Sequence, residues 1–158
     1  MSEDQVWLDR AVDLAVANVA DSGGPFGAVV VLDGLVIGEG ANRVTADLDP
    51  TAHAEVVAIR AACQGIESYS LAGAILYASC EPCPLCLSAS LWARVDAVVH
   101  AADSSAAARA GFDDDHFRGL FHPEAETERW PLRLQHLPTA RSEEPFDAWR
   151  AKADRIAY

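Results

Sequence analysis

Four side chains that can bind a metal ion or carry protons lie in two short stretches of the sequence. "TAHAEVVAIR" places His53 and Glu55 two residues apart at the start of a predicted helix, and "CEPCPLC" places Cys83 and Cys86 three residues apart. Zinc is bound by imidazole and thiolate, and a catalytic zinc site takes three protein ligands and keeps one position for water. His53, Cys83 and Cys86 are therefore candidate ligands of one Zn²⁺ per subunit.

Glu55 is expected to act on a proton and not as a ligand. On an ideal helix it lies about 200° from His53, so it could approach bound water only if the first turn is angled. A bound zinc ion would lower the pKa of that water toward neutrality, Glu55 would accept the proton, and the hydroxide would attack an electrophilic carbon. The four residues together predict a hydrolytic reaction.

Each motif alone has a simpler interpretation. A lone C-x-x-C is common, and H-x-E at a helix start is often a cap followed by a surface acid. Together, with Pro82 directly before Cys83, they match the H-x-E…P-C-x-x-C pattern of zinc deaminases. A structural zinc site is the alternative, and it would need a fourth protein ligand, for which Cys80 is the candidate.

The elements that must position these residues alternate between helix and strand. Hydrophobic spacing predicts helices over residues 4–20, 53–63 and 83–93 and strands over 74–79 and 95–102. Asp33-Gly34 suits the type I′ turn of a β-hairpin over residues 26–40. A short helix is expected in "SSAAARA" and an amphipathic C-terminal helix over 145–158, whereas residues 111–144 give no clear pattern.

This order predicts an α/β fold, a three-layer α/β/α sandwich around a mixed central sheet of about five strands. The 158 residues have the size of a single domain, 1–158, and 51% hydrophobic with 23% charged residues is an ordinary globular composition.

Charge and segment composition limit the partners. The net charge of −12 disfavours binding to nucleic acid through phosphates. No stretch approaches the roughly 20 apolar residues of a membrane span, and the N-terminus lacks a leader pattern, so no membrane partner and a cytoplasmic location are expected. Three cysteines within seven residues favour metal binding or catalysis over disulfides in that compartment.

With these motifs, the chain resembles the cytidine deaminase superfamily, and most closely the bacterial guanine deaminases of that fold. The resemblance spans nearly the whole chain and rests on "GGPFGAVVV", "DPTAHAEVVAIR", "SCEPCPLCL", "AGFDDD" and the final "FDAWR" with its terminal tyrosine. It implies zinc-dependent hydrolytic deamination of a free nucleobase, guanine to xanthine plus ammonia. It also implies a homodimer in which segment 145–158 is swapped and caps the partner's active site.

The resemblance assigns further residues to the site. Asp114 of "GFDD" would be a second proton shuttle, Phe26 and Asn42 would stack on and hydrogen-bond the base, and the backbone amides of Ala54 and Cys83 would border the pocket. From the residues alone, residues 113–115 indicate a solvated acidic turn, Phe26 a core strand position and Asn42 a turn.

Two aromatic residues complete the candidate set. Tyr158 ends the segment that would cap the partner's site. Trp92, near the end of the predicted cysteine-bearing helix, would pack under the base or in the core.

Other functions fit part of the pattern. The same zinc chemistry serves other amino-heterocycles, such as cytosine, a modified purine, guanosine, a pterin or a triazine. A tRNA adenosine deaminase is disfavoured by the charge of −12 and by the lack of a strongly basic C-terminal helix. A non-catalytic, zinc-stabilised binding module is the alternative from another class, and Glu55 weighs against it because a structural zinc has no use for that carboxylate.

Overall fold

A mixed four-stranded sheet forms the centre of the first of two compact units, residues 1–122 and 123–158. The computed structural model describes residues 2–112, 114–122, 124, 130–139 and 141–156. The strands are β1 (Gly27–Leu32), β2 (Leu35–Ala41), β3 (Ile75–Cys80) and β4 (Ala97–Ala102), in the order β2-β1-β3-β4. β1 pairs antiparallel with β2 and β3, and β3 pairs parallel with β4, which confirms the predicted mixed sheet.

The described residues form four strands and not the predicted five. After β4 the chain enters α5 (Ser104–Arg109), whose first turn is capped by the Asp103 side chain, an acceptor for the Ala106 amide. Alanine is the strongest helix former, and the "SSAAAR" sequence behind an aspartate cap therefore favours a helix at this position.

The hairpin turn is built as predicted. Asp33 and Gly34 both have positive φ, 51° and 73°, and the flanking Leu32 and Leu35 are paired in register. Two positive φ values at the central residues are the mark of a type I′ turn.

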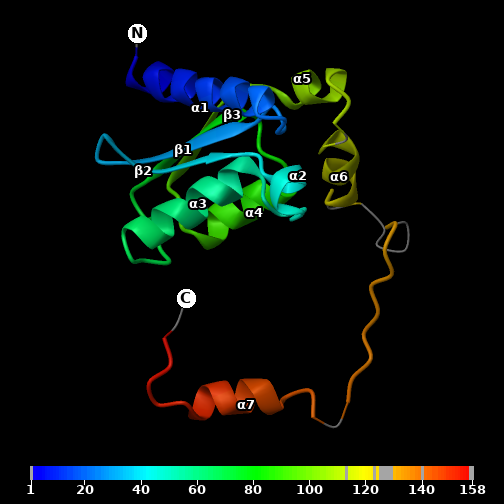
Figure 1. Cartoon of the computed structure of the whole chain (residues 1–158). Helices are drawn as coiled ribbons and strands as arrows, with labels where there is room; N and C mark the ends of the chain where they lie inside the picture. Colours follow the sequence, from blue (N-terminus) through cyan, green and yellow to red (C-terminus); the bar gives the residue numbers. More distant parts are fainter. Residues whose placement is uncertain (1, 113, 123, 125–129, 140, 157–158) are drawn as a thin grey trace. The chain divides into compact units, whose positions relative to one another are not determined.

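Helices cover both faces of the sheet (Figure 1), as predicted for three layers. On one face Val29 and Val31 of β1 pack with Ala11 of α1 (Glu3–Ala20). On the other face the alternate residues Ala28 and Val30 pack against α3 (Ala54–Gly65), beside α4 (Pro84–Trp92). Successive strand residues point to opposite faces, so β1 contributes to both halves of the core.

Two further helices of this unit lie in segments without a helix prediction. They are α2 (Val44–Asp47), within the expected polar loop, and α6 (Asp114–Leu120). Within the part of the chain that the structure describes, no helix has both the length and the apolar character to cross a membrane.

The second unit contains α7 (Glu144–Ala151), which is shorter than the predicted helix over 145–158. The backbone of Lys152 is already extended, with ψ 113°. Arg155 donates to the carbonyl oxygens of Arg150 and Lys152, and this satisfies acceptors at the helix end that a continuing helix would otherwise use.

Glycines on β2 allow α3 to lie unusually close to the sheet. A Cβ atom at Gly40 would lie 2.2 Å from the carbonyl oxygen of Ala54, and one at Gly38 would lie 2.5 Å from that of Ala58. Both contacts are with helix backbone, which cannot rotate away as a side chain can. The "GEG" sequence of β2 therefore fixes the position of α3, including its N-terminal turn.

We expect Gly40→Ala to displace the start of α3 and to lower the free energy of unfolding by about 1–3 kcal/mol, the usual cost of overpacking. Gly119→Ala is the matched control, because a Cβ there meets nothing within 4 Å and alanine favours a helix. Denaturant unfolding of both variants tests this; equal stability of Gly40→Ala and the wild type would contradict a close α3–β2 contact.

Candidate metal centre and cavity

The N-termini of α3 and α4 meet at the candidate ligands. His53 is the N-cap of α3 and Cys83 is the N-cap of α4, with Pro84 at the first helical position. Both caps have extended backbones, with ψ 153° and 171°. Proline suits this position because its missing N–H would have no partner inside the helix.

The extended backbone of His53 corrects one expectation. The separation of about 200° between His53 and Glu55 applies only if both residues are helical. Because His53 precedes the helix, the helical rotation does not set the direction of its side chain. His53 and Glu55 accordingly line the same cavity. Cys83 also precedes its helix and was predicted inside the first turn.

The three candidate ligands have the spacing of a tetrahedral zinc site. Nδ1 of His53 lies 3.5 Å from Sγ of Cys83 and 3.5 Å from Sγ of Cys86, and the two sulfur atoms are 3.7 Å apart. Tetrahedral bonds of about 2.3 Å to sulfur and about 2.0 Å to nitrogen require ligand separations of about 3.8 Å and about 3.5 Å. Among the described residues, this is the one group of at least three that could hold a metal ion.

Cys80, the candidate fourth ligand of a structural site, is not part of this group. Its sulfur lies 3.5 Å from the carbonyl oxygen of Asp103, to which it donates. The described ligands therefore number three, the number typical of catalytic zinc sites.

The electrostatics of the site favour thiolate. Neither helix has a side-chain cap, so the positive ends of two helix dipoles face the ligands. Hydrogen bonding from the Cys86 thiol and from His53 lowers the pKa of Cys83 to about 4. The same hydrogen bond to Cys83, with burial, raises the pKa of Cys86. One of the two sulfurs is thus predisposed to bind a cation as thiolate.

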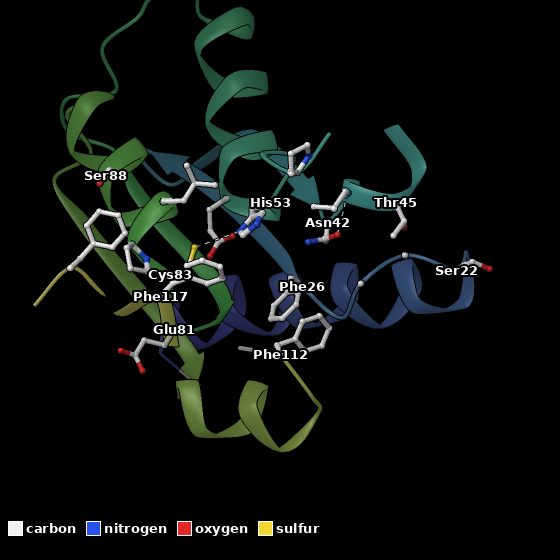
Figure 2. A pocket seen from close by; sticks show the side chains of 18 residues that line it. Ser22, Phe26, Asn42, Thr45, His53, Glu81, Cys83, Ser88, Phe112 and Phe117 are labelled. Carbon is white, nitrogen blue, oxygen red and sulfur yellow. Dashed lines mark hydrogen bonds between the residues drawn. The ribbon is translucent and has the colours of Figure 1, made fainter. Parts of the chain in front are cut away.

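A cavity of about 790 Å³ opens next to these residues (Figure 2). Glu55 lines it although its side chain is buried, with a residue exposure of 8%. Burial raises the pKa of Glu55, because the charged carboxylate loses its water. His53, Cys83 and Glu55 therefore place candidate metal ligands and a carboxylate at one wall of one cavity.

Aromatic and amide side chains form another part of the lining. The rings of Phe26 and Phe112 meet edge to face, with centroids 4.9 Å apart, and Phe117 also lines the cavity. Oδ1 of Asn42 accepts a hydrogen bond from the Val44 amide at 3.3 Å. The NH₂ group of Asn42 points toward His53 within the cavity (Figure 2). Phe26 and Asn42 thus lie at the cavity, and neither is only a core or turn residue.

The other candidate site residues lie elsewhere or outside the described part. Ala54 is the fully buried first residue of α3, between His53 and Glu55, which both line the cavity, and the predicted contact of its backbone amide with the base stays a prediction. Asp114 begins α6, but its side chain lies outside the described residues, as does the whole of Tyr158.

Trp92 neither lines the cavity nor packs in the core, contrary to both interpretations of the sequence. It is the last residue of α4 and is 66% exposed. The buried residues of α4 are Cys86 and Ser90. A residue two positions after Ser90 lies about 200° around the helix and so faces away from the core.

Sequence reasoning did not identify several residues at or beside the cavity. Glu81 lines it and forms an ion pair with Arg118, whose Nη1 is 3.1 Å from Oε1 of Glu81. Phe112 and Phe117 come from the segment after residue 110, where hydrophobic spacing gave no pattern. The sequence does contain one signal for Glu81, which is an acid placed between a predicted buried strand and the cysteine motif.

Comparisons with known proteins agree with this geometry. The zinc-binding region of cytidine and deoxycytidylate deaminases matches residues 1–102. Guanine deaminase of Bacillus subtilis (strain 168) is 50% identical over 155 residues, which cover 98% of both chains. A crystal structure of guanine deaminase from Bacillus subtilis has a TM-score of 0.90 at 47% identity and 98% coverage of both chains.

Two other relatives are partial matches. A guanine deaminase structure from Nitrosomonas europaea has a TM-score of 0.65 at 34% identity, covering 68% of this chain and 63% of that one. A tRNA-specific adenosine deaminase of Bacillus subtilis (strain 168) is 34% identical over 102 residues, 65% of this chain and 63% of its own. The match over residues 1–102 and over nearly the full length of a bacterial guanine deaminase places the chain in the cytidine and deoxycytidylate deaminase family.

Proposed function

We propose that this protein is a zinc-dependent aminohydrolase that converts guanine to xanthine and ammonia. One observation carries the proposal: the buried Glu55 lines the same cavity as His53 and Cys83, and these two residues form a three-ligand group with Cys86. The full-length similarity to a guanine deaminase supports guanine as the substrate.

In this proposal His53, Cys83 and Cys86 hold the zinc ion. The observed separations of 3.5 Å and 3.7 Å fit its coordination, and two thiolates with one imidazole are a donor set that zinc accepts. When bound, zinc supplies a Lewis acid that lowers the pKa of water toward neutrality.

Glu55 carries the protons. Its carboxylate takes a proton from water as the water oxygen forms a bond to C2 of guanine, and it delivers that proton to the ring nitrogen. The bond between C2 and the exocyclic amine then breaks, and the amine leaves as ammonia with the second proton of the water. The low polarity around Glu55 suits this role, because a carboxyl in such a site binds and releases a proton nearer to neutral pH.

Asp114 is the proposed second proton carrier, for the departing amine. The support for this role is the match of "AGFDDD" to the guanine deaminases.

The cavity lining supports a flat, polar heterocycle. Phe26 offers an aromatic surface, and its edge-to-face contact with Phe112 fixes the ring orientation. The Asn42 amide, oriented by Val44, offers a hydrogen-bond donor to a base. A site built to hydrogen-bond its substrate rejects analogues that lack the matching group, so Asn42 would favour bases with an acceptor at that position.

The assembly and location are proposals as well: a cytoplasmic homodimer, one zinc ion per subunit, with residues 1–158 acting as one deaminase domain. Segment 145–158 would be exchanged between the subunits. The exposed apolar residues Phe146, Trp149 and Ile156 support a partner surface for this segment.

We expect Cys83→Ala to lower zinc affinity at least about 100-fold, because one of three ligands is lost. Cys80→Ser is the matched control, because the Cys80 thiol donates a hydrogen bond to the Asp103 carbonyl and lies outside the ligand group. Zinc content after dialysis and a competition titration measure this. Equal loss of zinc in Cys80→Ser would restore the structural four-ligand alternative.

We expect Glu55→Gln to reduce kcat for guanine by about 10²–10⁴-fold, the usual contribution of a positioned acid–base group, while zinc content stays at the wild-type level. Ammonia release is measured with guanine, guanosine, cytosine, adenine and a pterin. Glu67→Gln, the same change at an exposed position, should be fully active. Release from a different heterocycle would retain the chemistry and replace the substrate, and no release from any would favour a binding module.

We expect Asp114→Asn to reduce kcat about 10²-fold or more, because the amide cannot transfer a proton to the amine. The same ammonia assay checks this, together with zinc content. Unchanged turnover would leave Asp114 as the solvated acid that its sequence context alone suggests.

A further inference from the structure

Helix α6 contributes side chains to the cavity, and its Arg118 contacts the metal-binding loop. Phe117 of α6 and Phe121 just beyond it line the cavity. Nη1 of Arg118 lies 3.1 Å from Oε1 of Glu81, and Nη2 donates to the carbonyl oxygen of Pro82 at 2.6 Å. Glu81 and Pro82 directly precede the ligand Cys83, so Arg118 connects α6 to the metal centre.

The acceptor side of this contact is rigid. The second oxygen of Glu81 accepts from the Ser104 amide at 3.0 Å, and the Glu81 amide donates to the carbonyl of Ala102 at 2.9 Å. Glu81 is therefore fixed to the end of β4 and the start of α5, and its carboxylate is held in place for Arg118.

The contact is more sheltered from water than an ordinary surface ion pair. The side chains of Arg118 and Glu81 are 26% and 30% exposed, which places both largely out of water. The guanidinium serves two acceptors at once, and such charge-assisted, two-point contacts are about twice as strong as neutral hydrogen bonds. A methionine at position 118 would keep much of the side-chain volume and lose both contacts.

The chain before α6 turns at a glycine. Gly111, between α5 and α6, has φ +94°, and a Cβ there would meet nothing within 4 Å. The turn therefore needs glycine for its backbone conformation, and it is not held by packing on that side. Gly119 inside α6 is equally open.

We propose that Arg118 is a positioning residue: its contacts with Glu81 and Pro82 hold α6 against the metal-binding loop and keep Phe117 in the cavity wall. This rests on the proposed function, in which the cavity takes the nucleobase. Without the contacts, a smaller fraction of the protein has α6 in place. The apparent dissociation constant is the intrinsic one divided by that fraction, so KM rises while kcat at saturating guanine is retained.

Arg118→Met tests the proposal, with Arg109→Met as the matched control. Arg109 is exposed on the neighbouring helix α5 and donates a hydrogen bond to Ser105. Its replacement by methionine removes the same positive charge. For Arg118→Met we expect faster hydrogen exchange in the amides of α6 than in the wild type. We also expect KM for guanine to rise about five- to tenfold with kcat within about twofold, because both contacts of the guanidinium are lost and fewer molecules have α6 in place.

Arg118→Lys guards against a general folding defect. Lysine keeps the charge but has no fork to reach both acceptors, so its KM and α6 exchange should lie between those of wild type and Arg118→Met. Unchanged α6 exchange in both variants would overturn the proposal. A fall in kcat with unchanged KM would do the same, because it would mean a smaller fraction of folded enzyme. If the wild type does not act on guanine, the proposed function fails, and α6 exchange still decides the role of Arg118.

Discussion

The convergence of two helix N-termini is the constraint on which the rest of the site depends. His53 and Cys83 precede α3 and α4 as N-caps with extended backbones, and this brings three ligand atoms within 4.8 Å. An N-cap residue does not have helical backbone angles, so the ligand His53 and the carboxylate of Glu55 reach one cavity from the same helix start. The glycines of β2 matter here because they allow α3 to lie close enough to the sheet for its first turn to meet that of α4.

A bound cation would favour the fully charged form of this meeting point. Without one, only Cys83 has a lowered pKa, because the hydrogen bond to Cys83, with burial, raises the pKa of Cys86, and burial raises the pKa of Glu55. Two thiolates and a carboxylate together would repel one another and lose their hydration, at a cost of several kcal/mol for each uncompensated ion. Two helix dipoles would offset part of this cost, each equivalent to about half an elementary charge. A divalent ion on His53, Cys83 and Cys86 would compensate the remainder.

The sequence predicted the elements that have strong local signals. The Asp33-Gly34 turn and the mixed sheet follow from turn chemistry and hydrophobic spacing, and the grouping of His53 with Cys83 follows from the two motifs. Trp92 was placed wrongly because its exposure depends on which face of α4 packs, which short apolar helices do not reveal. Arg118 was missed because its partner Glu81 is 37 positions away, and an ion pair at that separation leaves no periodic signal. The length of α7 depended on a local contact, from Arg155 to the helix carbonyls.

The metal ligands and part of the cavity wall come from different parts of the chain. The region shared with cytidine and deoxycytidylate deaminases ends at residue 102, and it contains His53, Glu55 and both cysteine ligands. Phe112 and Phe117, which complete the cavity wall, lie beyond it. The hydrolytic groups can therefore stay in place while the segment after β4 changes the shape of the cavity. The segment after β4 therefore shares the cavity wall with Phe26 and Asn42, which precede it.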